Sequence, residues 1–266
     1  MELTVDGRTA YAYTGGKSFD AALPCVVFIH GALNDHSVWT LLARWFAHHG
    51  HAVLALDLPG HGRSDGPPLA DVEALADWLP ALLDAAGVRK AALVGHSMGS
   101  LIALEAAARA PQRVERLVML GTAVPMKVSD ALMQTSLTQP LKAIDMVNAF
   151  SHAGTASKPS YPGPGSWLHG ADRALMRRIQ SGQPGLNLFH HDFGVCDRYA
   201  GGLAAAGKLR CPASVVIGSR DQMTSPKQTT AIVDALNARV LSVDAGHSMM
   251  SEAPDAVLAA LRSALA

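Results

Sequence analysis

A serine between two glycines is the feature that most restricts how this chain can fold. The sequence G-H-S-M-G at residues 95–99 follows a short apolar run at 91–94 and precedes an Ala- and Leu-rich segment at 100–110. The run predicts a buried strand and the segment predicts a helix. A serine at such a turn is typical of a nucleophile elbow, where glycines permit a bend too sharp for side chains. We therefore expect Ser97 to project from the end of a strand.

The rest of the chain alternates between strand and helix patterns. An N-terminal hairpin is predicted at 2–5 and 9–13, around an Asp-Gly turn. Further strands are predicted at residues 25–29, 52–56, 116–120, 212–218 and 239–243, and helices at residues 37–49, 71–86 and 226–236. Such alternation is typical of a parallel sheet covered by helices on both faces. The expected fold class is therefore α/β, with a mostly parallel central sheet.

Two more residues with chemically useful side chains follow predicted strands. Asp221 comes just after the strand at 212–218, and His247 comes just after the strand at 239–243. The carboxyl ends of parallel strands share one edge of a sheet, and open α/β sheets bind ligands at that edge. Ser97, Asp221 and His247 are therefore expected to meet in space, although they lie far apart in the sequence.

Other short motifs occupy matching places along the chain. They are H-G at 30–31 with Trp39 closing an H-G-x7-W spacing, D-L-P-G-H-G-R-S at 57–64, and G-H at 246–247 followed by E-A-P at 252–254. With the elbow and the chain order Ser, Asp, His, they make nearly the whole chain resemble the α/β-hydrolase superfamily. The resemblance is to its branch of capped serine esterases, lactonases and carbon–carbon hydrolases. It implies an α/β-hydrolase fold with a helical cap inserted after the sixth strand.

The resemblance also implies a role for each site residue. Ser97 would be the nucleophile, His247 the general base, and Asp221 the acid that orients the imidazole. The backbone N–H groups of Ala32 and Met98 would form the oxyanion hole. Dehalogenases and epoxide hydrolases of this fold use aspartate as nucleophile, so a serine in the elbow indicates acyl chemistry instead.

The expected activity is hydrolysis of a small or medium carboxylic ester or an (enol-)lactone through an acyl-enzyme on Ser97. Carbon–carbon bond hydrolysis of a dienoic ketone is an alternative that uses the same residues. A second alternative, from another class, is a ligand-binding relative without catalysis. Relatives of that kind typically lack members of the triad, whereas this chain has all three.

The regular alternation stops after Gly121. The predicted core comprises residues 1–121 and 209–266, and residues 122–208 form the predicted helical cap within that domain. Helices are expected at residues 129–150, 171–180 and 189–199, and an irregular loop at residues 158–166, which is rich in Pro and Gly.

The cap and the loop after residue 31 provide candidates for a substrate pocket. These candidates are Leu33, Met126, Trp167 and Phe193. Residues 122–208 contain eight Lys or Arg against five Asp. This excess could attract a substrate carboxylate, and a solvated surface would explain it equally well.

The sequence predicts no metal and no cofactor. The tripeptide His190-His191-Asp192 contains potential metal ligands, but adjacent residues on a helix point in different directions. We therefore interpret this segment as pocket lining or helix surface rather than as a metal site.

Composition restricts partners and location. The chain has 22 Lys plus Arg and 22 Asp plus Glu, so its formal net charge is zero. Such a balance provides no basic field for nucleic acid or for an anionic membrane. The N-terminal residues do not resemble a signal peptide, and the three cysteines have no metal spacing. We expect a cytoplasmic protein with a small-molecule ester or lactone as its partner, and the sequence leaves the oligomeric state open.

Overall fold

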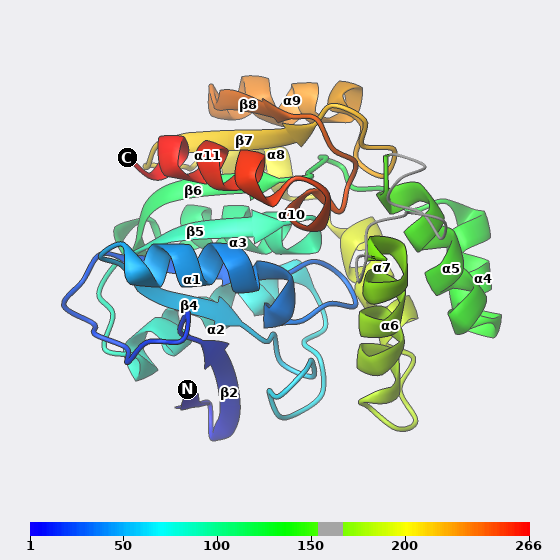
Figure 1. Cartoon of the computed structure of the whole chain (residues 1–266), viewed down its shortest axis with the longest axis horizontal. Coiled ribbons are helices and arrows are strands. Elements are labelled where there is room, and N and C mark those ends of the chain that lie inside the picture. Colours follow the sequence, from blue (N-terminus) through cyan, green and yellow to red (C-terminus); the bar gives the residue numbers. More distant parts are fainter. Residues whose placement is uncertain (154–166) are drawn as a thin grey trace.

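The computed structural model describes residues 1–153 and 167–266, and within them eight strands form one central sheet (Figure 1). The strands are β1 (Glu2–Val5), β2 (Arg8–Tyr13), β3 (Cys25–Ile29), β4 (Ala52–Leu56), β5 (Ala91–His96), β6 (Val114–Leu120), β7 (Ala213–Gly218) and β8 (Arg239–Val243). Their order across the sheet is β1-β2-β4-β3-β5-β6-β7-β8. The N-terminal hairpin joins β4 antiparallel, and the strands from β3 to β8 pair in parallel. The predicted α/β class and mostly parallel sheet are confirmed.

Helices cover both faces of the sheet. The strand β3 shows why both faces need cover, because all five of its side chains are buried. Val26 and Phe28 pack in one apolar cluster, whereas Val27 and Ile29 pack in the other, as alternation along a strand requires. One face is covered by α1 (Thr40–His48) and α11 (Pro254–Leu265), and the other by α2 (Val72–Ala85), α3 (Met98–Arg109) and α9 (Pro226–Leu236).

A helical insertion, residues 122–208, separates β6 from β7. Its described helices are α4 (Asp130–Thr138), α5 (Pro140–Ser151), α6 (Leu168–Ser181), α7 (Leu188–Arg198) and α8 (Gly202–Ala206). The helices α4 to α7, green to yellow-green in Figure 1, gather beyond the ends toward which the parallel strands point. The insertion therefore lies at the edge of the sheet where the predicted site residues emerge. The predicted loop at 158–166 falls outside the described residues.

The helix boundaries differ from the prediction in three places. The helix expected at 129–150 is two helices, because Pro140 lacks an N–H and begins α5 instead of continuing α4. The helix expected from residue 37 begins with a 3₁₀ turn at His36–Trp39. Three helices were not predicted from the sequence, namely α8, the short α10 (Met249–Glu252) and α11. No helix in the described part of the chain is long and apolar enough to cross a membrane.

Candidate active site

The serine at the elbow has a strained backbone. Ser97 has φ of 52° and ψ of −120° and stands between β5 and the first residue of α3. A Cβ on Gly95 would run into the backbone carbonyl of Gly99, and a Cβ on Gly99 would run into that of Ile29. Both positions therefore require glycine for the elbow to close against the neighbouring strand. The result is a serine side chain at the N-terminus of a helix and at the carboxyl edge of the sheet.

Asp221 and His247 form a hydrogen-bonded pair at the same edge. The Nδ1 of His247 lies 2.8 Å from Oδ2 of Asp221, and both side chains are buried. Thr224 holds the carboxylate further, because its N–H donates to Oδ1 at 2.9 Å and its hydroxyl donates to Oδ2 at 2.8 Å. With a proton on Nδ1 directed at the carboxylate, the Nε2 of a neutral His247 ring is left as an acceptor. No hydrogen bond joins His247 to Ser97 among the described residues.

The environment keeps Asp221 ionised and His96 neutral. Burial alone raises the pKa of Asp221, but the interaction with His247 and the hydrogen bonds from Thr224 outweigh it and lower this pKa to about 2. Burial and the nearby His247 lower the pKa of His96 to about 3. The neutral His96 ring uses Nε2–H to bond the backbone carbonyl of His247 at 2.9 Å. His96 thus holds the backbone of His247 in place.

The loop after β3 brings a second backbone group toward Ser97. In this loop, the backbone carbonyl of Gly31 accepts a hydrogen bond of 2.8 Å from the Nδ1–H of His30. The following residue, Ala32, and the first helical residue, Met98, donate no backbone hydrogen bond to any described residue. Unpaired N–H groups at such positions are what an oxyanion hole needs. His30 therefore holds the backbone of the loop that carries Ala32.

A cavity of about 300 Å³ connects these groups. Ser97, His247 and Ala32 line it from the core, and four segments of the insertion contribute the opposite wall. That wall is mostly apolar and contains Met126, Val128, Leu132, Met146, Val147, Phe150, Met176 and Phe193. The only charged residues on the described lining, apart from histidine, are Lys127 and Asp172. The serine and histidine therefore face a predominantly apolar space.

Residues 24–254 match the model of a protein family described as the alpha/beta hydrolase fold. This chain belongs to that family. A pimeloyl-[acyl-carrier protein] methyl ester esterase of Chromobacterium violaceum is 30% identical over 88% of this chain and 84% of its own length. The enol-lactonase structure from Burkholderia xenovorans superposes with a TM-score of 0.83 at 21% identity, covering 100% of this chain and 99% of that one.

A third relative is a longer protein than this chain. The acetyltransferase component of an acetoin cleaving system of Cupriavidus necator is 30% identical over 94% of this chain but only 65% of its own length. The match to a mouse sn-1-specific diacylglycerol lipase covers 44% of that protein. The chain thus spans less than two thirds of the curated relatives that it matches first.

Only part of the predicted pocket lining faces the cavity of this α/β-hydrolase chain. Met126 and Phe193 lie on the cavity wall. Leu33 is fully buried in the core, so its side chain does not reach the wall. Trp167 directly precedes α6, is 47% exposed and lies against Gly170 in the first turn of that helix, outside the cavity lining. The methionines from α5, α6 and the loop before α9 were missed, because no sequence pattern says which helix face meets this space.

Other carboxylates that could be considered as a partner for His247 make different contacts. Asp145 pairs with Arg173 on the surface of the insertion. Asp244, three residues before His247, has a side chain that is 82% exposed and pairs with Arg220. The position after β6 holds Thr122, whose hydroxyl accepts a hydrogen bond from Ser100. Asp221 is therefore the carboxylate that the fold brings to His247.

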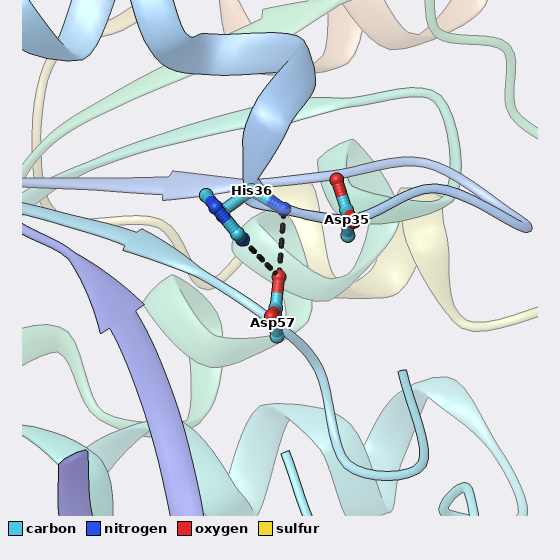
Figure 2. A group of neighbouring side chains, drawn as sticks. All are labelled: Asp35, His36 and Asp57. Carbon is cyan, nitrogen blue, oxygen red and sulfur yellow. Dashed lines mark hydrogen bonds and ion pairs between the residues drawn. The ribbon is translucent and has the colours of Figure 1, made fainter. Parts of the chain in front are cut away.

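A separate acidic cluster lies in the core near β4 (Figure 2). One ligand atom from each of Asp35, His36 and Asp57 lies within 4.8 Å of the others. Asp57 accepts from the backbone N–H of His36 at 2.7 Å and from its ring at 2.8 Å, and its other oxygen accepts from the N–H of Arg63 at 2.9 Å. Asp35 accepts hydrogen bonds from Ser37. The hydrogen bonds of Asp57 connect the loop after β4 to the segment after β3. They explain the cluster without a ligand.

Proposed function

We propose that this chain is a serine hydrolase that cleaves a carboxylic ester or lactone through an acyl-enzyme on Ser97. The observation that carries the proposal is the hydrogen bond between Asp221 and His247, because the His247 ring lines the same mostly apolar cavity as the elbow serine. Family membership and the methyl ester esterase relative favour the same chemistry. The proposed catalytic residues are Ser97, His247 and Asp221.

In the first half of the reaction, Nε2 of His247 takes the proton of the Ser97 hydroxyl as Oγ attacks the substrate carbonyl. The carbonyl oxygen becomes an oxyanion, which the N–H groups of Ala32 and Met98 would stabilise. His247 then gives the proton to the leaving alcohol, and the acyl group stays on Ser97. Asp221 stabilises the imidazolium that exists between these transfers.

In the second half, a water molecule replaces the alcohol. His247 takes a proton from the water, the hydroxide attacks the acyl carbonyl, and the proton returns to Ser97 as the carboxylic acid leaves. In the net reaction, one ester and one water give one acid and one alcohol. For a lactone, the acid and the alcohol remain in one molecule.

The cavity supports a neutral substrate of small or medium size. No arginine is on its described lining, and Lys127 already donates to the backbone carbonyl of Asp197 at 2.6 Å. Two arginines of the insertion pair with carboxylates outside the cavity, Arg173 with Asp145 and Arg178 with Asp35. A largely apolar wall around about 300 Å³ suits a short or medium acyl chain better than an anionic one.

The same proposal includes the domain organisation. Residues 1–121 and 209–266 would form the hydrolase core, and residues 122–208 would act as its cap, because the insertion provides most of the cavity wall facing Ser97.

The three cysteines are free, and burial raises the pKa of Cys25 to about 12, which keeps this thiol protonated and unreactive. Reduced structural thiols agree with the proposed cytoplasmic location.

Covalent labelling tests the nucleophile. A fluorophosphonate should phosphonylate the Ser97 oxygen with loss of fluoride, and intact-mass spectrometry should show one adduct per chain. Ser97→Ala should abolish the adduct and lower ester turnover by roughly 10⁴-fold or more, because the triad acts as a unit. Ser181→Ala, at an exposed serine of the insertion, is the matched control and should label normally. Normal labelling and turnover in Ser97→Ala would refute the proposal.

The substrate class is tested by a panel. Hydrolysis rates would be measured with p-nitrophenyl esters of increasing acyl length, with lactones and with a dienoic ketone. The proposal predicts the highest kcat/KM for a short or medium ester or a lactone. Turnover of the dienoic ketone alone would show carbon–carbon hydrolysis, and no turnover with an unlabelled wild-type Ser97 would show a binding protein.

A further inference from the structure

A carboxylate from the insertion reaches into the loop that carries Ala32. Asp192, on α7, is only 1% exposed, and its Oδ2 accepts the backbone N–H of Leu33 at 2.8 Å. The two residues lie 159 positions apart in the sequence. The same oxygen lies 2.8 Å from Nε2 of His61, a core residue that is 3% exposed. One buried carboxylate oxygen thus joins the insertion, the loop after β3 and the loop after β4.

The loop needs this acceptor because of its conformation. Leu33 has φ of 56°, in the left-handed region that a bulky side chain rarely adopts. Its N–H is buried, and a buried donor without a partner is costly. The residue before it is Ala32, whose own N–H is the proposed oxyanion donor. The bond to Asp192 therefore fixes the peptide on one side of Ala32, and the bond from His30 to Gly31 fixes the peptide on the other.

The histidine partner fixes the position of the carboxylate. The Nδ1 of His61 lies 3.1 Å from the carbonyl of Pro59, and Nε2 faces Asp192, so both ring nitrogens have acceptors and both act as donors. Burial lowers the pKa of His61, but the Asp192 charge and hydrogen bond outweigh it and leave this pKa raised. The adjacent His30 stays neutral, since burial and the charge of His61 lower its pKa to about 4. His61 therefore links the Asp192 carboxylate to the carbonyl of Pro59 through its two ring nitrogens.

We propose that Asp192, oriented by His61, is a positioning residue for the oxyanion hole. The hole then has its working shape only while α7 is seated on the core, which makes catalytic competence depend on the insertion as well as on the triad. This inference rests on the proposed serine-hydrolase function. Asp192 acts through the backbone of Leu33 and does not itself line the cavity.

Three variants and one control test the inference. Asp192→Ala removes the acceptor, Asp192→Asn keeps a carbonyl acceptor without the charge, and His61→Gln keeps an N–H donor without the imidazolium. Arg178→Gln is the matched control, because it breaks another ion pair between the insertion and the core, with Asp35, and leaves the Leu33 N–H untouched. Each protein is quantified by active-site titration with the fluorophosphonate, so that unfolded molecules do not contribute to the rate.

Per titrated site, Asp192→Ala should lower both kcat and the phosphonylation rate constant by roughly 10²-fold, the effect of a lost oxyanion donor, with KM changed by less than about threefold. Asp192→Asn and His61→Gln should lose about tenfold, and Arg178→Gln should match wild type. A purely structural role would reduce the titratable fraction while leaving kcat per site unchanged, and that result would overturn the inference.

The conservative variants keep the test decisive if Asp192→Ala fails to fold. Rates per site within twofold of wild type in both Asp192→Asn and His61→Gln would then refute positioning. Failure of the proposed function is a distinct outcome, because wild-type protein would itself not be labelled at Ser97.

Discussion

Acid should destabilise this fold partly through His96, and a single substitution isolates the effect. The ring is 4% exposed, donates Nε2–H to the carbonyl of His247 at 2.9 Å, and packs against the His247 ring with centroids 4.7 Å apart. A Cβ on Gly121 would lie 3.2 Å from both rings, so the space is filled. In the folded protein the pKa of His96 is therefore lowered to about 3, so the ring stays neutral until the pH falls to that value.

The sign follows from where the proton binds. The unfolded chain takes up a proton at His96 near the ordinary pKa of 6.5, whereas the folded chain does not until about 3. Between these values the unfolded state binds more protons, so the free energy of unfolding falls as the pH falls. The slope approaches about 1.4 kcal/mol per pH unit well below pH 6.5, and the loss between pH 6.5 and pH 4.5 is about 2 kcal/mol. Above about pH 7.5 this contribution no longer changes.

The variant His96→Gln removes the titration and keeps an N–H donor for the carbonyl of His247. Urea unfolding curves at pH 6.5, 5.5 and 4.5 would give the free energy of unfolding of each protein. Wild type should lose about 2 kcal/mol more than His96→Gln over this range. Other titrating groups, including His30, remain in both proteins and cancel in the difference.

A surface histidine provides the control. His48 is exposed at the end of α1, and His48→Gln should give a pH curve parallel to that of wild type. If wild type and His96→Gln lose the same free energy between pH 6.5 and pH 4.5, His96 is not held neutral in the folded state. The account of the site as a neutral imidazole supporting the backbone of His247 would then be wrong.

Two further results are expected from the site itself. Asp221→Asn should keep the fold, judged by circular dichroism, and lower kcat on a p-nitrophenyl ester by roughly 10³–10⁴-fold, because His247 loses the partner that sets its tautomer; near-normal kcat would exclude Asp221 as the orienting acid. Phe193→Ala should move the preferred acyl chain about three methylenes longer, at up to about 0.8 kcal/mol of burial for each, because it opens the cavity wall. An unchanged chain-length profile would place the acyl group elsewhere.

The parallel strands were predictable almost residue by residue, and the reason is physical. A strand buried on both faces is a continuous apolar run that stops where the chain must turn, so β3 and β4 have the predicted ends. Helix boundaries depend more on local competition. The break before Pro140 is such a case, since the apolar pattern continues through it while the proline ends the hydrogen-bond ladder.

The proposed triad could be predicted from the sequence because regular geometry relates its members. Ser97, Asp221 and His247 each follow a parallel strand, and the carboxyl ends of such strands meet at one edge. No comparable rule relates an inserted helix to that edge. The apolar pattern of α7 shows which of its faces is buried, and it does not show which part of the core that face will meet.

Asp192 illustrates the consequence. In the sequence it stands beside two histidines and draws attention as a potential metal ligand, and its actual partners, Leu33 and His61, lie 159 and 131 positions away. A buried carboxylate requires donors, so burial of Asp192 would have been enough to predict that some existed. Only the packing of the insertion determines that one of them is the N–H beside Ala32. The part of the site that depends on docking between the insertion and the core is therefore the part that the sequence leaves open.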